Sequence, residues 1–392
     1  MSGKEPKLDT DLLSSSNSAT QIARPLRVLF VAPSMDILGG QAVQADRLMN
    51  RLRREPSLEI GFLPINPRLP GVLRKLQLIK YVRTVVTSIL YVLTLLLRVP
   101  KYDVLHVFSA SYFSFVLAPT PAILVGRLYG KRVLLNYHSG EADDHLRRWR
   151  RSAIPTIRLA DEVVVPSNYL VRVLAQFGLP ARAILNLVET DKFQFRQRQP
   201  LRPLFLSNRN FESHYGVDRV LRAFKIIQSE QPDARLTVAG DGPERRSLEN
   251  LARELELRNV TFTGRIDHDQ VPALYDGSDI FLNGSEIDNQ PLSILEAFAC
   301  GLPVVTTNAG GIPDIVDHEQ TGLVVKRGDY QSLANNARRL LDDEALGQRL
   351  VQQAREECRK YSWEPLRDQW LAVYNALASE TAQAEKTKLA RA

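Results

Sequence analysis

Asp288 and Glu296 are two carboxylates that stand eight positions apart in the stretch LNGSEIDNQPLSILEAFACGLPVVTT, separated by an Asn-Gln pair and a Pro-Leu turn. The run from Ser293 to Cys300 predicts a helix, and Gly301 after it suits a left-handed C-cap. Free N–H groups at a helix start favour a phosphate, whereas carboxylates accept hydrogen bonds from hydroxyls. This stretch therefore predicts a ligand that is half phosphate and half polyhydroxyl, such as a nucleotide sugar.

The length and composition indicate a globular protein of two domains. The chain has 392 residues, of which 44% are hydrophobic and 24% are charged, and both values are ordinary for a soluble protein. Its two cysteines, Cys300 and Cys358, offer neither a disulfide framework nor metal-ligand spacing, which favours a reducing compartment. Residues 1–24 contain the polar run LLSSSNSAT and lack the pattern of a secretory signal, so we expect a disordered tail there.

Strand and helix patterns alternate along most of the chain. Leu26–Ala32 is apolar and predicts a buried strand, Gly39 and Gly40 form the loop after it, and 41–53 is helical. This is the opening unit of a doubly wound α/β domain, and its loop is either close to a bound phosphate or a tight turn without a ligand. Further strands are expected at 103–107, 132–137, 161–166 and 183–187, with helical sequence at 112–129 and 169–177.

A second α/β set follows the polar run 194–202, which predicts the interdomain linker. It contains the turn Gly240-Asp241-Gly242-Pro243 after a strand, and a final amphipathic helix at 363–377 precedes a charged, frayed end. We therefore divide the chain into a tail (1–24), an N-terminal domain (25–194), a C-terminal domain (195–362) and a helix at 363–380 that returns to the N-terminal domain.

His138 follows the predicted strand 132–137, at the edge where doubly wound sheets bind ligands. A lone histidine at such a position is either structural or part of a site. Four arginines follow nearby, and they suit either a solvated helix face or a phosphate on an acceptor or lipid; they are Arg147, Arg148, Arg150 and Arg151.

The segment 60–102 contains no Asp or Glu but seven Lys or Arg residues, a number equal to the formal net charge of +7 of the whole chain. Its fourteen-residue uncharged run TVVTSILYVLTLLL is shorter than the ~20 apolar residues of a membrane-spanning helix. Two interpretations stay open. The segment is either a buried helix with a basic exposed side, or a basic amphipathic surface that lies on anionic lipid.

From about Leu26 to Leu377 the chain resembles the retaining, nucleotide-sugar-dependent glycosyltransferases of family 4. The most specific match is Asp288–Thr307, followed by Gly310-Gly311-Ile312-Pro313-Asp314 and by Gly322-Leu323-Val324-Val325. The Gly-Gly loop, the GDGP turn and a terminal helix that begins at a Trp agree with the family in order and spacing. The resemblance implies a GT-B fold of class α/β, in which two Rossmann-like domains face each other across a cleft.

The resemblance also implies roles for individual residues. Glu296 accepts from the ribose hydroxyls, Asp288 holds hydroxyls of the donor sugar, and amides at the helix start meet the diphosphate. Pro291 has no N–H, which leaves Leu292 and Ser293 as the better donors. The residues implied in catalysis are His138, Arg209 and Asp288, and those implied in substrate binding are Gly39, Gly40, Ile266, Asn289, Gln290, Leu292, Ser293 and Glu296.

Two positions depart from the family pattern. Asp288 stands where the family usually has Glu, and its side chain is one methylene shorter. Arg209 matches the first of two cations that neutralise the diphosphate, but Tyr215 stands where a Lys is usual. A tyrosine donates a hydrogen bond without a charge, and electrostatic stabilisation of a leaving group is usually a large contribution to catalysis. His214, Arg265 or a residue of the facing domain are candidates to replace the missing cation.

The sequence therefore predicts a metal-independent retaining glycosyltransferase with no cofactor beyond its UDP- or GDP-sugar donor. We expect it to transfer a hexose to a glycan or lipid-linked acceptor in cell-envelope or lipid-linked glycan synthesis, from the cytoplasm and peripherally at the inner face of the membrane. The alternative is a catalytically silent GT-B-like subunit that binds a nucleotide sugar or a protein partner. A nucleic-acid partner is not expected, because the basic residues are not interleaved with aromatic ones.

Overall fold

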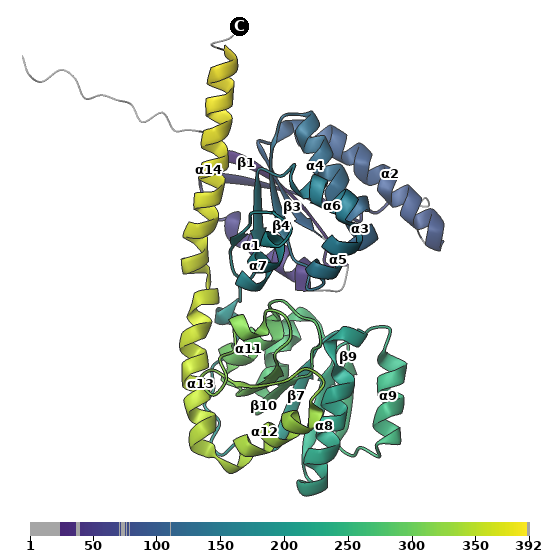
Figure 1. Ribbon diagram of the computed structural model, residues 1–392, viewed down its shortest axis with the longest axis vertical. Coiled ribbons are helices and arrows are strands. Elements are labelled where there is room, and N and C mark those ends of the chain that lie inside the picture. Colours follow the sequence, from purple (N-terminus) through teal and green to yellow (C-terminus); the bar gives the residue numbers. More distant parts are fainter. Residues whose placement is uncertain are drawn as a thin grey trace, which may run out of the picture.

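The computed structural model describes residues 24–36, 40–69, 71, 75, 77, 79–109 and 111–389, and this part of the chain forms two α/β domains, one above the other in Figure 1. The first domain has a six-stranded sheet whose strand pairs are all parallel. Its strands, in spatial order, are β2 (Leu58–Pro64), β1 (Leu26–Ala32), β3 (Val104–Ser109), β4 (Arg132–Tyr137), β5 (Glu162–Val165) and β6 (Arg182–Ala183).

The second domain repeats this architecture with another six-stranded parallel sheet in the described residues. Its strands, in spatial order, are β12 (Leu323–Val325), β11 (Val304–Thr307), β10 (Ile280–Asn283), β7 (Leu204–Asn208), β8 (Arg235–Ala239) and β9 (Val260–Gly264). Parallel strands need crossover connections, and helices supply them in both domains. The predicted pair of Rossmann-like domains is therefore confirmed.

Helices cover both faces of each sheet. Along β1, Leu29 and Val31 belong to one buried cluster, whereas Val28, Phe30 and Ala32 belong to the cluster on the opposite face. This explains why the strand is an unbroken apolar run instead of an alternating one. The helices of the first domain are α1 (Gly40–Leu52), α2 (Lys80–Arg98), α3 (Tyr112–Leu117), α4 (Pro119–Leu128), α5 (Ala142–Arg148), α6 (Arg150–Ile157) and α7 (Asn168–Ala175), with the 3-10 turns η2 (Val99–Lys101) and η3 (Thr190–Lys192).

The last two helices, α13 and α14, run in line along one side of the molecule and span both domains (Figure 1). The helices of the second half are α8 (Val217–Glu230), α9 (Arg245–Glu254), α10 (Val271–Asp276), α11 (Leu292–Cys300), α12 (Tyr330–Asp342), α13 (Glu344–Cys358) and α14 (Trp363–Leu389). The 3-10 turns among them are η4 (Ser213–Tyr215), η5 (His268–Gln270), η6 (Ile312–Asp314) and η7 (Arg359–Tyr361).

Several expected elements differ in extent from those observed. Strand β2 was missed, because its sequence was grouped with the apolar segment that follows it. The helical sequence at 112–129 is two helices, and the second begins at Pro119, where proline is tolerated as a first helical residue. The strand expected at 183–187 pairs only at Arg182–Ala183, and the final helix continues to Leu389 instead of ending near Leu377.

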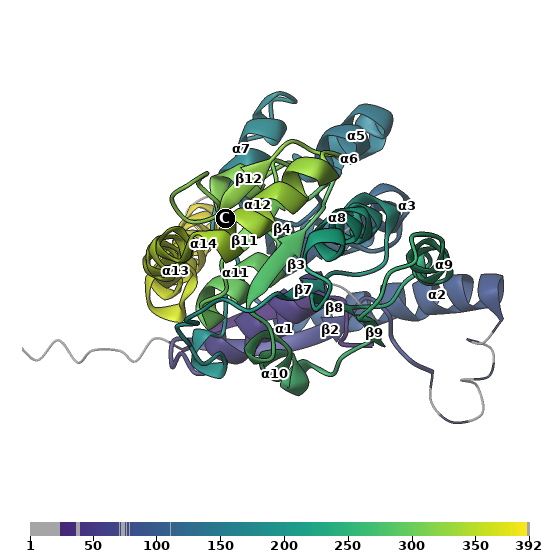
Figure 2. The same cartoon turned by 90° about the horizontal axis from the view of Figure 1, so that it is seen from below.

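Helix α2 lies at the outer edge of the first domain, and one of its ends extends beyond the strands (Figures 1 and 2). Tyr91 and Leu95 anchor one face of it in the core, and the Tyr91 hydroxyl donates to the Ala118 carbonyl at 2.8 Å. The other face exposes apolar side chains, so the expectation of a buried helix with a basic exposed side was wrong. Tyr81–Lys101 is long and apolar enough to cross a membrane by length and composition, although the uncharged run had predicted a shorter element.

His106, in the middle of β3, connects the first sheet to the last helix. Asn136 Nδ2 lies 3.1 Å from Nε2 of the imidazole, and the hydroxyl of Tyr374 in α14 lies 2.7 Å from Nδ1. The ring also packs against Trp370 of α14. Because the amide donates to Nε2, we assign the single ring proton to Nδ1. Burial holds the pKa of His106 well below 6.5, so the ring is neutral.

We predict that the free energy of unfolding falls as the pH drops from 6.5 to 5. In this range the unfolded chain binds a proton at His106 that the folded chain does not, so stability is lost as pH falls. The slope approaches about 1.4 kcal/mol per pH unit for each such histidine. Urea unfolding at several pH values measures it. His106→Gln should lower the slope by the contribution of one histidine; a slope equal to that of the unaltered protein would contradict the prediction.

Candidate functional site

The start of α11 is the point where the predicted phosphate site and the opposite domain meet. Its N-cap is Pro291, whose side chain makes no capping hydrogen bond. A Cβ atom on Gly40, the first residue of α1, would lie 3.9 Å from Leu292 Cδ1, so the starts of the two helices approach each other. N–H groups at such a start lack intrahelical acceptors and favour an anion. The prediction for the loop at Gly39 lies outside the described residues.

Asp288, Arg209 and Ser293 form one contact group beside this helix start. Arg209 Nη2 donates to Asp288 Oδ2 at 2.5 Å, and Arg209 Nη1 donates to the Ser293 hydroxyl at 3.2 Å. The hydroxyl of Ser285 also donates to Asp288 Oδ2, at 3.1 Å. Asp288 and Ser293 are buried, as is most of the Arg209 side chain. The structure thus brings together three residues that the sequence had placed at the site separately.

The ring of Tyr215, where a lysine was expected, stacks against the guanidinium of Arg209. The Arg209 Cζ atom lies 4.0 Å from the ring centroid, a cation–π contact. Burial raises the pKa of the Tyr215 hydroxyl, so the side chain stays neutral. Tyr215 therefore orients the one cation of this loop and adds no second charge.

The GDGP turn, Gly240–Pro243, holds the same loop through backbone hydrogen bonds. Arg209 N donates to the Ala239 carbonyl at 3.0 Å, and Phe211 N donates to the Asp241 carbonyl at 3.0 Å. Gly240 has φ 139°, and a Cβ atom there would lie 2.0 Å from the Arg209 carbonyl oxygen. A larger residue at Gly240 would displace the backbone that carries Arg209, which explains why the turn needs glycine.

Both carboxylate oxygens of Glu296 are engaged by protein donors. The hydroxyl of Tyr275 donates to Oε2 at 3.1 Å, and Arg47 Nη2 donates to Oε1 at 3.0 Å. Arg47 lies on α1 of the first domain, so this is an ion pair between domains. Its guanidinium also lies 3.1 Å from His268 Nε2 and 3.3 Å from Glu189 Oε2.

The amide side chains of Asn289 and Gln290 bridge the two domains. The hydroxyl of Ser167 donates to Asn289 Oδ1, and the backbone N–H of Asn186 donates to Gln290 Oε1 at 2.7 Å. Asn186 Nδ2 also donates to the Gln290 carbonyl at 3.3 Å. The side-chain oxygens of Asn289 and Gln290 are thus bound to the first domain, and a contact between the backbone amides and a donor stays a prediction.

His138 and Ile266 lie on opposite sides of the domain contact. His138 stacks on Phe108, and burial lowers its pKa to about 4, so it is neutral near pH 7. Two residues after it, a Cβ atom on Gly140 would lie 3.6 Å from the Asp288 backbone. The loop that carries His138 therefore meets the Asp288 loop. Ile266 follows β9 and packs against the core beneath α11.

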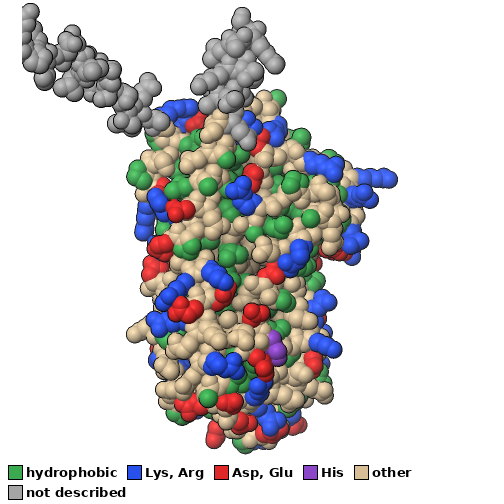
Figure 3. All heavy atoms as spheres, turned by 60° about the vertical axis from the view of Figure 1, so that its left-hand side comes forward, with side chains coloured by type: hydrophobic (Ala, Val, Ile, Leu, Met, Phe, Trp, Pro, Cys, Tyr) green, Lys and Arg blue, Asp and Glu red, His purple; other side chains and the backbone are tan. Residues whose placement is uncertain are grey.

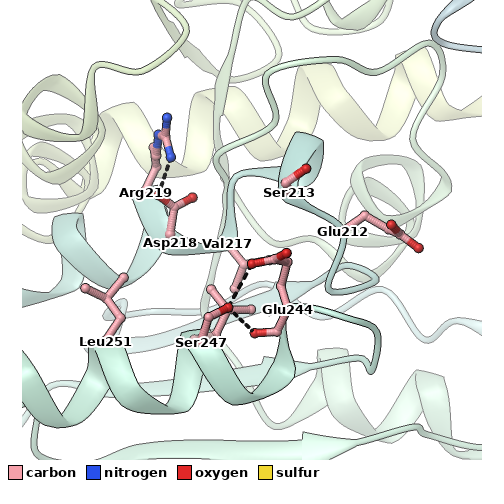
Figure 4. Close-up of a pocket in the computed structure, with 9 residues that line it drawn as sticks. Glu212, Ser213, Val217, Asp218, Arg219, Glu244, Ser247 and Leu251 are labelled. Carbon is pink, nitrogen blue, oxygen red and sulfur yellow. Dashed lines mark hydrogen bonds and ion pairs between the residues drawn. The ribbon is translucent and has the colours of Figure 1, made fainter.

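A separate pocket of about 230 Å³ lies between the starts of α8 and α9, next to the Arg209 loop (Figure 4). Glu212, Asp218 and Glu244 line it, and Arg219 is its one basic residue. Its predominantly acidic lining does not suit a diphosphate. Within the described ranges, no group of three or more His, Cys, Asp or Glu residues is placed to hold a metal ion.

Arg47, Tyr275 and His268 were not predicted from the sequence. The position of Arg47 in the sequence could have indicated a buried, paired cation, because Arg47 interrupts the apolar face of a helix whose buried residues include Ala45 and Leu48. A charged residue on a buried face needs a partner. Its partner Glu296 is 249 positions away, and helical periodicity gives no information on contacts at that distance.

Two family patterns match the chain, one in each half. "Glycosyltransferase Family 4" matches residues 38–192, and "Glycosyl transferases group 1" matches residues 189–357. Among solved structures, Anabaena HepE in complex with UDP-glucose superposes with a TM-score of 0.72 at 18% identity, covering 90% of this chain and 100% of HepE. At that identity the likeness shows the shared GT-B fold.

Relatives with assigned names are glycosyltransferases. The sulfoquinovosyl transferase SQD2 of Arabidopsis thaliana is 30% identical over 286 residues, which are 67% of this chain and 54% of SQD2. The GDP-mannose-dependent alpha-(1-6)-phosphatidylinositol monomannoside mannosyltransferase of Mycobacterium tuberculosis is 30% identical over 268 residues, 62% of this chain and 69% of that enzyme. The chain spans about half the length of the first of these relatives. With both halves matched and the fold shared, the chain belongs to the family 4 glycosyltransferases of the GT-B type.

Proposed function

We propose that the protein is a retaining, metal-independent hexosyltransferase that uses a nucleoside-diphosphate sugar as donor. The observation that carries this proposal is the group formed by Arg209, Asp288 and Ser293 beside the uncapped start of α11. It combines a buried cation and the first N–H groups of a helix for a diphosphate with a carboxylate for sugar hydroxyls. HepE, which shares the fold, was solved with UDP-glucose, and this supports a UDP-sugar as a first donor to test.

In the proposed reaction, the acceptor hydroxyl attacks the anomeric carbon from the face that the diphosphate leaves. The new C–O bond forms as the bond from the anomeric carbon to the phosphate oxygen breaks. A phosphate oxygen of the leaving group takes the acceptor proton, so no side chain needs to act as nucleophile. Arg209 and the α11 amides stabilise the charge that develops on the diphosphate. Neutral His138 can hydrogen-bond the transferred sugar without adding charge.

A catalytically silent subunit is the second candidate, and one observation favours it. Tyr215 stacks on Arg209 where family members usually have a lysine, so the leaving diphosphate meets one cation of this loop instead of two. A silent subunit would bind nucleotide sugars without transferring or hydrolysing them. The donor panel described below separates the two candidates.

We also propose that the acceptor is presented at an anionic membrane surface, which would make the protein peripheral on the inner face of the membrane. Every large hydrophobic side chain exposed in the described part of the chain lies between Met35 and Leu159, in the first domain. On α2 these side chains recur every four residues in an apolar stripe: Tyr81, Val85, Ile89, Leu93 and Leu97. Spacing of four places them on one side of the helix.

The opposite side of α2 is fixed in the core by Tyr91 and Leu95, which favours a helix that lies along a bilayer over one that crosses it. The surrounding segment without acidic residues complements anionic lipid. On the face shown in Figure 3, acidic and basic side chains are interspersed over most of the surface, a pattern unlike the continuous basic groove of a nucleic-acid-binding protein.

Arg209→Met should lower kcat by about 10²- to 10³-fold, because it removes a charge that acts on the leaving group. The assay measures transfer and hydrolysis with a panel of UDP-, GDP- and ADP-sugars. Arg338→Met, which removes a surface pair with Glu230, is the matched control and should retain activity. Binding without turnover of any donor by the unaltered protein would support the silent subunit instead.

Glu296→Ala should abolish donor binding, since the carboxylate is proposed to accept from the ribose hydroxyls. Glu296→Gln is the sharper variant, because it keeps the size of the side chain and removes its charge. Calorimetry with the nucleoside diphosphate measures the affinity, and the unfolding midpoint checks that each variant is folded. Donor affinity equal to that of the unaltered protein would refute the role of Glu296.

Ile89→Glu combined with Leu93→Glu should reduce co-flotation with vesicles of phosphatidylcholine and phosphatidylglycerol by about tenfold or more, because charged residues replace two members of the apolar stripe. Thr84→Glu combined with Thr94→Glu is the control, since it changes the charge of α2 equally without removing a member of the stripe. Binding that is indifferent to lipid charge, or equal losses in both double variants, would count against the proposal.

A further inference from the structure

Arg47 is a cation of the first domain that lies inside the proposed donor site of the second. It projects from α1, is 3% exposed, and donates from Nη2 to Glu296 Oε1 at 3.0 Å. The same Nη2 lies 3.1 Å from His268 Nε2. Burial and the charge of Arg47 lower the pKa of His268, so its neutral ring can accept at Nε2.

Two nitrogen atoms of this guanidinium are not satisfied. Nε and Nη1 are buried and have no hydrogen-bond partner among the described residues, although Nε lies 3.3 Å from Glu189 Oε2, within ion-pair distance. Buried polar groups are normally hydrogen-bonded, and a buried donor without a partner destabilises the fold. An unpaired N–H of a charged group, next to a carboxylate proposed to hold a ligand, indicates that the ligand supplies an acceptor.

The position of Arg47 identifies which part of the donor this is. The diphosphate is proposed to lie at the start of α11, near Arg209 and Ser293. Glu296 lies one turn further along the helix, and His268 lies two positions after Ile266, a position whose backbone, by the family resemblance, meets the base. Arg47 therefore lies at the nucleoside end of the donor. It does not replace the second diphosphate cation, the lysine that is usual at the position of Tyr215.

A ribose diol suits this pair of residues. Each hydroxyl has one proton to donate and lone pairs with which to accept. Glu296 can accept from the hydroxyls but cannot donate to them, whereas the guanidinium can only donate. Together the two side chains provide both kinds of partner, and each carboxylate oxygen can accept a second hydrogen bond while Arg47 stays bound.

We propose that Arg47 is a donor-binding residue, which donates from Nη1 to a ribose hydroxyl oxygen while Glu296 accepts that hydroxyl's proton. The inference rests on the proposed function, in which Glu296 holds the ribose. The nucleoside is then held by both domains, and the ribose supplies the acceptor that Nη1 lacks. The competing role is a purely structural link, in which Arg47 only ties α1 to α11.

The test combines a protein variant with a change in the nucleotide. Arg47→Met should weaken binding of UDP or GDP by about 10- to 100-fold in calorimetry, the usual effect of losing a hydrogen bond to a charged group. The same variant is then measured with the 2′-deoxy and 3′-deoxy nucleoside diphosphates. With at least one of them, the loss caused by Arg47→Met should shrink to about twofold or less, because the partner of Arg47 is already gone.

Arg51→Met is the matched control, one turn further along α1. Arg51 pairs with Asp191 in the same domain at 3.0 Å, so its loss should leave nucleotide affinity unchanged. Arg47→Lys keeps the charge with fewer donors and should recover part of the affinity. Unfolding midpoints of all variants verify that they are folded.

The other possible results of these binding measurements would contradict the proposal. Equal weakening by Arg47→Met for ribose, 2′-deoxy and 3′-deoxy nucleotides would show a structural link and overturn the inference alone. If the unaltered protein binds the nucleotide tightly and Arg47→Met leaves the affinity unchanged, the inference about Arg47 is overturned and the proposed function is not affected. No binding of any nucleoside diphosphate by the unaltered protein would overturn both.

Discussion

The proposed site depends on a difference in side-chain hydrogen bonding between the two ends of α11. At its C-terminal end, Arg198 donates to the carbonyls of Cys300 and Gly301 at 2.7 and 3.2 Å, which pairs a cation with the negative end of the helix dipole. At the N-terminal end the N-cap residue, Pro291, makes no side-chain capping hydrogen bond. The helix is buried from Ser293 onward, so it cannot tilt to expose those amides elsewhere. Because the helix is fixed and Arg198 binds its C-terminal carbonyls, its positive N-terminal end can bind a ligand.

The linker takes part in this arrangement. The polar run 194–202 resembles a flexible connector in sequence, yet Arg198 within it is 5% exposed and also binds the Tyr275 and Ser278 carbonyls. Tyr275 in turn contacts Glu296. The segment that joins the domains is therefore connected through hydrogen bonds to the proposed ribose carboxylate.

The sequence predicts features that depend on neighbouring residues, and it does not predict contacts between residues far apart in the chain. The helix at 293–300 and its left-handed cap at Gly301 depend on neighbouring residues, and both were predicted correctly. The side of α2 that faces the core was not predictable, because an apolar run without charges looks the same from every side. The Arg47–Glu296 pair and the amide bridges of Asn289 and Gln290 join residues about 100 or more positions apart, so local patterns contain no trace of them.

The contact between the domains includes hydrogen bonds and ion pairs, among them the Arg47–Glu296 pair and the bridge from Asn186 to Gln290. Within the first domain, Gln44 on α1 donates to the Leu187 carbonyl at 2.7 Å and accepts from the Leu187 backbone N–H at 2.9 Å, next to Asn186, the residue that bridges to Gln290 of the second domain. Water can replace such partners at low cost when surfaces separate, unlike the apolar contacts of a core. The interface therefore suits domains that part to exchange ligands and then return to one defined arrangement.

The return of α14 to the first domain has a consequence for biosynthesis. Leu366, Trp370 and Tyr374 belong to the same buried cluster as Val28 and Phe30 of β1, so one face of the first sheet is completed by residues that are translated only after the second domain. At ordinary elongation rates the intervening chain takes on the order of tens of seconds to make. During that time the emerging first domain has an uncovered apolar face. A chaperone would have to protect it on the ribosome, and the two domains would reach maturity together.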